Sequence, residues 1–371
     1  MRVGGIRIRL ILIVVSILIL VSAMSAAHAE PYLAVQQGLK CMQCHLNPSG
    51  GGERTLFGEV FAQNVMPARH VDTGDRVWTG MLNDFVGFGG NLRADAEWQQ
   101  VRGRDAVSAF GLQQARAYLS VAMIPERLLV YMDEQLAPGT AVNREAWAQL
   151  WLFDKKVYVK AGQMYLPFGF RLQDQNAYIG QLVGINMTTP DHGVELGFEQ
   201  GAWDGRIAVS NGASGGVESD NNKQFTGQLA YVMANWRLGV GFDLNRLAAG
   251  QLRGGTLFTG VRTGPVVWLA EIDWVSAPIT VNSTARRVTQ AAALLEADWL
   301  VARGHNIKVV GERLDPNRDV SGDARTRLSA IYEWTPMQFL QLRTGWRRAT
   351  SQTNVDALHQ QQAFVELHAF F

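Results

Sequence analysis

The chain has 371 residues, with 34 Lys and Arg against 33 Asp and Glu, 47% hydrophobic residues and 18% charged residues. This hydrophobic content is too high for an intrinsically disordered protein, and the mean hydropathy near zero is too low for a bundle of transmembrane helices. The near-zero net charge excludes a nucleic-acid binder that works by bulk electrostatics, and the length allows two or three ordinary domains or one large β-barrel.

The first 29 residues have the three parts of a secretory signal peptide. Three arginines and no acidic residue precede an apolar stretch from Leu10 to Val21, and Ala27-His28-Ala29 provides a small-residue cleavage site. An uncleaved membrane anchor is the alternative, but the apolar stretch is short of the roughly 20 residues that a spanning helix needs. We predict that residues 1–29 are removed before Glu30 and that the mature chain is exported. No later apolar run is long enough for a helical span, so any membrane span must be built from β-strands.

The only two cysteines lie in Cys41-Met42-Gln43-Cys44-His45, the C-x-x-C-H pattern of c-type haem attachment. One turn of backbone brings both thiols beside the two haem vinyl groups, and His45 then lies under the iron as an axial ligand. A disulfide and a thioredoxin-like redox pair are the alternatives. A disulfide gives the histidine no role, and a redox pair requires a βαβ context that this sequence lacks. We predict one covalently bound haem c, with Cys41 and Cys44 as anchors and His45 as the proximal iron ligand.

The second axial ligand stays open. Met66 and His70 are the only methionine and histidine between the motif and the first predicted strand, apart from Met81 at the edge of that strand. The context Asn64-Val65-Met66-Pro67 favours Met66 over His70 as the distal ligand, and a five-coordinate iron is the other alternative. Residues 30–82, the predicted haem segment, contain few large apolar side chains. We therefore expect residues from the rest of the chain to line much of the haem pocket.

Residues 83–371 show the period-2 alternation of β-strands. From Val86 to Gln99, even positions are apolar or small and odd positions are polar or glycine. Several such stretches exceed ten residues, the length that a tilted membrane strand needs, whereas strands of soluble proteins average about 5–6 residues. We predict an all-β fold, a transmembrane antiparallel barrel of sixteen strands. The predicted strands begin near residues 83, 109, 127, 145, 156, 192, 203, 223, 235, 253, 265, 288, 304, 323, 337 and 360.

The predicted connections alternate in length. Tight turns such as Asp154-Lys155 follow every even-numbered strand, whereas longer loops, such as 165–191 and 276–287, follow odd-numbered strands. Bacterial barrels have short periplasmic turns and long extracellular loops. We therefore predict a barrel embedded in the lipid of the outer membrane of a Gram-negative bacterium, with the N- and C-termini in the periplasm. The terminal Phe371 resembles the C-terminal signature of outer-membrane proteins.

The order of signal peptide, single C-x-x-C-H motif and sixteen-stranded barrel resembles the monohaem outer-membrane cytochrome–porin fusions, whose best-known members oxidise extracellular ferrous iron. The likeness covers the whole mature chain as architecture, and in residues it includes the haem motif, Asn47-Pro48 and Phe57-Gly58. It implies an electron-transfer protein with a haem plug inside or at the mouth of the barrel. Electrons would then pass from extracellular Fe(II) or another external donor to a periplasmic carrier such as a soluble cytochrome.

The loop 165–191 resembles the constriction region of the phosphate-selective porin superfamily, in Pro167-Phe168-Gly169-Phe170-Arg171 and in Pro190-Asp191-His192-Gly193. In sixteen-stranded porins the third long loop folds into the lumen, and we expect the same here, with a surface loop as the alternative. Two function classes stay open. One is an electron conduit, with iron oxidation as its potential enzymatic activity. The other is a porin for small solutes in which the haem segment is a plug, a sensor or a periplasmic appendage.

Overall fold

The computed structural model describes residues 30–371 except residues 75, 76, 175, 215, 219, 248, 282 and 283. The signal peptide predicted for residues 1–29 lies outside the described residues. Within the described ranges, no helix is long and apolar enough to cross a membrane.

Most of the described chain is β-strand, and the few helices are short. The strands are β1 (Val86–Val101), β2 (Val107–Ile124), β3 (Leu128–Ala137), β4 (Val142–Leu152), β5 (Val157–Met164), β6 (Asp191–Gln200), β7 (Trp203–Ser210), β8 (Gln224–Val232), β9 (Trp236–Leu247), β10 (Gly250–Thr263), β11 (Val266–Val281), β12 (Thr284–Ala302), β13 (His305–Asp315), β14 (Arg325–Met337), β15 (Leu340–Ser351) and β16 (Gln360–Phe370). The helices are α2 (Pro31–Gln37), α3 (Cys41–Cys44), α4 (Leu56–Asn64), α5 (Tyr178–Val183) and the 3-10 helix η1 (Asp356–Leu358).

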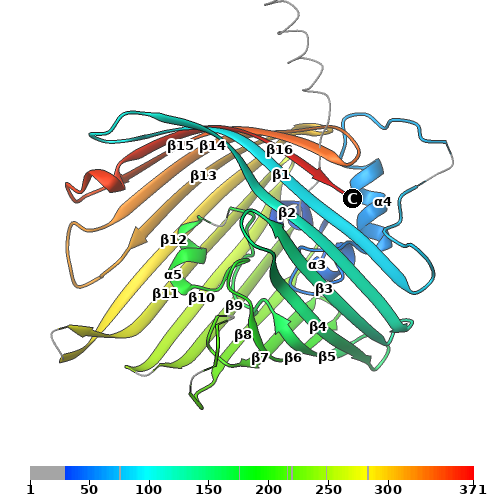
Figure 1. Ribbon diagram of the computed structural model, residues 1–371, viewed down its shortest axis with the longest axis horizontal. Coiled ribbons are helices and arrows are strands. Elements are labelled where there is room, and N and C mark those ends of the chain that lie inside the picture. Colours follow the sequence, from blue (N-terminus) through cyan, green and yellow to red (C-terminus); the bar gives the residue numbers. More distant parts are fainter. Residues whose placement is uncertain are drawn as a thin grey trace, which may run out of the picture.

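The strands form one closed antiparallel barrel (Figure 1). Each strand pairs with its neighbours in sequence, and β1 closes the barrel against β16 over a register from Asn91↔Phe370 to Val101↔Gln360. The predicted fold class and number of strands are confirmed, and every strand begins within four residues of its predicted start. The connections that follow even-numbered strands have two to four residues, and we call this end of the barrel the short-turn end.

One predicted loop is wrong. Residues 276–281 and 284–287 extend two strands, since β11 continues to Val281 and β12 begins at Thr284. Pro278 lies in this stretch, and proline cannot donate a ladder hydrogen bond. Beyond Ser276, however, β11 pairs only with β12, so the missing N–H of Pro278 leaves no gap toward β10.

The two faces of the barrel wall have opposite chemistry. Along β9, the side chains of Trp236, Leu238 and Val240 are exposed, whereas Arg237 and Asp243 are buried inside the lumen. The same alternation puts large apolar side chains on the outside of most strands. An apolar exterior around a charged interior is the pattern of a barrel whose outer face contacts lipid.

Residues 30–74, which we call the plug, lie at the short-turn end of the barrel. In Figure 1, α3 lies within the barrel and α4 lies at its mouth beside the C-terminus. Hydrogen bonds join the plug to strands around the wall, and each crosses from one plug residue to one barrel residue. They are Tyr32 Oη to Glu333 Oε2 (3.1 Å), Arg237 Nη2 to Leu39 O (2.6 Å), Asn47 Nδ2 to Glu145 Oε2 (2.6 Å), Ser120 Oγ to Glu53 Oε1 (2.7 Å) and Ala68 N to Thr335 O (2.7 Å). The plug is thus held by the barrel rather than by a core of its own.

The connection from β5 to β6, residues 165–190, turns into the lumen, as expected, and we call it the inward loop. Its helix α5 lies inside the barrel (Figure 1), where Ile179 packs against Leu294 and Val310 of the wall. The backbone N–H of Phe170 donates to Glu271 Oε2 at 2.6 Å, and that of Tyr178 donates to Glu312 Oε1 at 2.8 Å. The lumen is therefore filled by the plug at the short-turn end and by the inward loop beyond it.

Candidate haem-binding site

The plug, the inward loop and strands β7–β10 enclose a cavity of about 1160 Å³, a volume that includes space open to solvent. Cys41, Cys44 and His45 all line it. Its apolar walls come from both the plug and the barrel, and they include Leu33, Phe61, Leu166, Phe168, Phe170, Val232 and Phe258.

The local sequence explains how the motif reaches this cavity. Helix α3 is a single turn, which the Gln43 side chain caps by accepting a hydrogen bond from the Lys40 N–H at 2.8 Å. His45 leaves the helix with an extended backbone and pairs with Arg54 in an isolated antiparallel bridge. Gly50, with a φ of 84°, is one of three consecutive left-handed glycines that turn the chain back between these partners.

Helix α4 packs directly on the haem motif because residue 58 has no side chain. A Cβ atom added to Gly58 would collide with the carbonyl oxygen of Cys44. We therefore expect Gly58→Ala to separate α4 from α3 and to destabilise the plug by about 1–3 kcal/mol, the usual cost of overpacking. Limited proteolysis of the purified protein measures this as faster cleavage within the plug. Gly311→Ala is the matched control, since a Cβ there meets no atom within 4 Å. Equal cleavage of the two variants would contradict this packing.

The electrostatics of the motif suit a metal ligand better than a redox-active dithiol. Burial, helped by the positive charge of Arg54, lowers the pKa of His45 to about 3, so the imidazole is neutral at pH 7. Its Nδ1 atom is buried without a hydrogen-bond partner. Burial next to Cys41 raises the pKa of Cys44 to about 11, whereas catalytic C-x-x-C thiols have lowered pKa values. A neutral, partly unsatisfied imidazole is the form that binds iron.

The cavity also carries a surplus of positive charge. Five cationic residues line it against two acidic ones, Glu30 and Asp204. The cations are Lys40, Arg54, Arg171, Arg206 and Arg237. The Nε atom of Arg237 is buried without a hydrogen-bond partner. Lys40, Arg54 and Arg206 already pair with Glu199, Glu59 and Asp204. Two haem propionates would match the two other cations, Arg171 and Arg237, so the residues present fit a covalently bound haem.

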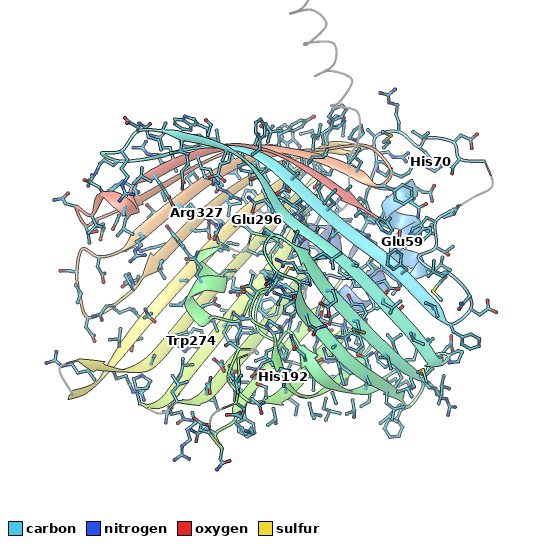
Figure 2. The ribbon with its side chains drawn as sticks, viewed as in Figure 1. Glu59, His70, His192, Trp274, Glu296 and Arg327 are labelled. Carbon is cyan, nitrogen blue, oxygen red and sulfur yellow. The ribbon has the colours of Figure 1, made fainter. Side chains whose placement is uncertain are left out.

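The two predicted candidates for the distal ligand lie in different places. Met66 lines the cavity. His70 is exposed, its Nδ1 atom lies 3.3 Å from the carbonyl oxygen of Gln63, and Figure 2 shows it beyond α4, away from the lumen. The structure thus brings Met66, and not His70, to the cavity that holds the motif.

Sequence reasoning missed two side chains that the inward loop adds to the cavity. Met187 lines it, and its methyl carbon would be 3.7 Å from a Cβ atom at Gly51. Arg171 donates from Nη1 to the carbonyl oxygen of Gly50 at 3.0 Å. The predicted inward fold of residues 165–191 was the signal that could have placed both in the lumen. In the part of the chain that the structure describes, no group of three or more His, Cys, Asp and Glu residues is arranged to hold a metal ion by itself.

Comparisons with known proteins identify the fold. No known family model and no curated protein sequence matches the chain. Among solved structures, an anion-selective porin from Comamonas acidovorans has a TM-score of 0.60 at 12% identity, over 77% of this chain and 99% of that chain. OprB of Pseudomonas putida, in a high-pH structure, has a TM-score of 0.58 at 10% identity, over 77% and 94%. OmpF of Salmonella typhi, in complex with daunomycin, has a TM-score of 0.59 at 12% identity, over 77% and 97%. At these identities the likeness concerns the fold alone, and the chain has the closed barrel fold of outer-membrane porins.

Proposed function

We propose that the protein is an outer-membrane electron conduit, a porin-type barrel with one haem c attached through Cys41 and Cys44 and ligated by His45. The observation that carries the proposal is the position of the C-x-x-C-H motif, which lines a mostly apolar cavity inside the barrel. When bound, the haem supplies a one-electron Fe(III)/Fe(II) couple. A closed barrel provides a polar passage for such a centre across an apolar band about 25 Å tall.

The residues around the cavity have separate tasks in this proposal. The thiols of Cys41 and Cys44 would hold the cofactor covalently, and the neutral imidazole of His45 would ligate the iron. Arg237 supplies an unsatisfied N–H for a propionate. Met66 and Met187 both line the cavity, and the thioether of one of them would be the second iron ligand. The phenylalanine walls keep water away from the centre and so help to set its potential.

The direction of the barrel follows from its connections. Short turns in bacterial barrels face the periplasm, so the plug and both ends of the mature chain would lie on that side. A soluble periplasmic cytochrome would then meet the plug end, and an external donor, such as Fe(II), would approach from the long loops. With Fe(II) as the donor, the protein would act as an iron-oxidising cytochrome.

Epitope tags test this orientation. Tags inserted after Gly139, between β3 and β4, and after Val320, between β13 and β14, should bind antibody on intact cells. Matched tags after Lys155 and Gly201, in two of the short turns, should bind only after the outer membrane is permeabilised. Labelling of the short-turn tags on intact cells would reverse the proposed topology.

A second candidate function is a porin for small solutes, in which the N-terminal segment is a plug, a sensor or a periplasmic appendage. The fold comparisons favour it more directly than they favour electron transfer, because the similar solved structures are porins. The filled lumen argues against free diffusion of solutes through the intact protein. Two measurements on the purified protein separate the candidates: conductance in planar bilayers and the absorbance change of haem on adding a reductant. Low conductance with one reducible haem per chain supports the conduit, whereas high conductance without haem supports the porin.

A further inference from the structure

Glu30, the residue that follows the predicted cleavage site, belongs to a buried ionic cluster in the lumen. Its Oε2 atom lies 3.1 Å from Lys308 Nζ. The same ammonium group lies 3.2 Å from Glu296, 3.6 Å from Asp298 and 3.9 Å from Glu333. None of these five residues is more than 5% exposed. One lysine is therefore shared by four buried carboxylates.

The neighbouring cations do not correct this imbalance. Arg343 lies 3.2 Å from Glu333 and 3.1 Å from a fifth carboxylate, Glu366, and Arg93 interacts with Glu366 and Glu30. Five carboxylates thus face three cations. Two buried oxygens of the cluster, Asp298 Oδ2 and Asn306 Oδ1, also lack a hydrogen-bond donor. Buried charges and acceptors without partners are costly, so the cluster is suited to a further cationic donor.

We propose that this cation is the α-ammonium group that signal-peptide removal creates at Glu30. In the precursor, the Glu30 nitrogen is an uncharged amide with one N–H. When the export peptidase adds water across the Ala29–Glu30 bond, Ala29 gains the carboxylate and Glu30 gains an ammonium group, with one positive charge and three donors. The charged N-terminus would then pair with the buried carboxylates and hold the plug in the lumen.

The surrounding contacts hold the Glu30 backbone close to this cluster. Pro31 opens α2 directly after Glu30, and the next residue, Tyr32, donates from Oη to Glu333 at 3.1 Å. The ammonium of Lys308 lies 4.9 Å from the centre of the Tyr32 ring. The Glu30 backbone is therefore held beside the cluster that its own side chain joins. Cleavage would then strengthen the docking of the plug in the lumen.

Amine labelling of the wild-type protein tests the proposal. Intact mass first establishes that the mature chain begins at Glu30, and any other start would overturn the proposal. An amine-reactive reagent near neutral pH, read out by peptide mass spectrometry, should then modify the Glu30 α-amine about tenfold or more slowly in the native than in the unfolded protein. Lys155, whose side chain is 48% exposed, is the internal reference and should react readily in the native protein. Equal labelling of the α-amine in both states would overturn the proposal.

A pair of insertions provides the second test. A Gly-Ser-Gly insertion between Ala29 and Glu30 moves the α-ammonium away from the cluster. It should expose the α-amine to labelling and lower the temperature at which protease begins to cut the plug. The same insertion after Gly74, where a built Cβ meets no atom within 4 Å, should change neither. Unchanged labelling and protection in the first variant would contradict the proposal. Neither readout depends on haem, so this inference and the electron-transfer proposal fail separately.

Discussion

Replacing Cys41 and Cys44 together with alanine should abolish covalent haem while the barrel still assembles. Each thiol can form one thioether bond to the porphyrin. When both thiols are absent, no covalent link to the haem survives denaturation. Cys44→Ala alone should also remove the label, because efficient attachment requires both anchors. The barrel should persist because its strands pair with one another without help from α3. A covalent-haem stain on a denaturing gel measures the first effect, and heat-modifiable migration on the same gel measures the second.

Met187→Leu is the matched control for the cysteine variants. It alters the same cavity, keeps the volume of the side chain and leaves both thiols in place, so the stain should remain. The absorbance spectrum of this variant and of Met66→Leu then tells which thioether, if either, binds the iron. A stain that persists in the double cysteine variant would refute the assignment of the motif.

Deleting the plug, residues 30–74, should convert the protein from a nearly closed barrel into a conducting channel. The plug fills the short-turn end of the lumen, and its removal frees charged wall residues such as Arg237 and Glu145 to meet water. Sixteen-stranded barrels without such a plug enclose an aqueous channel, so we expect single-channel conductance to rise by about tenfold or more. The inward loop remains as a constriction and should keep the pore narrower than the barrel itself.

Planar bilayers measure this change directly. The control is a Gly-Ser-Gly insertion after Gly74, which lengthens the same exposed segment but leaves the plug in place and should conduct as little as the wild type. If the wild-type protein already conducts as well as the deletion variant, the plug does not close the lumen, and the solute-porin function gains support.

The barrel could be predicted from sequence because its signal is local and repeated. Lipid outside and charged lumen inside impose strict alternation on every strand, and the turn residues divide the pattern into segments. The prediction failed where a strand pairs on one side only, as at Pro278, because a turn-forming residue there costs no hydrogen bond. The C-x-x-C-H motif is also a local signal of five consecutive residues, and the haem that it indicates stays a prediction.

The cavity could not be predicted in the same way, because it is built from contacts between distant parts of the chain. Arg171 reaches Gly50, and Asn47 reaches Glu145, across about a hundred residues of sequence in each case. No periodic pattern encodes such pairs. The sequence could therefore name Met66 and His70 as candidates but could not tell that Met66 alone of the two lines the cavity, nor that Met187 joins it.

Electron transfer across a sealed membrane tests the central claim most directly. Liposomes carrying the purified protein would hold a soluble cytochrome inside as the trapped acceptor. A bulky Fe(II) chelate, too large to enter the lumen, would be added outside as the donor. The wild-type protein should reduce the trapped cytochrome, and the double cysteine variant should not. Reduction at the same rate by both proteins, or by neither, would contradict the proposed role of the haem as the carrier of electrons through the barrel.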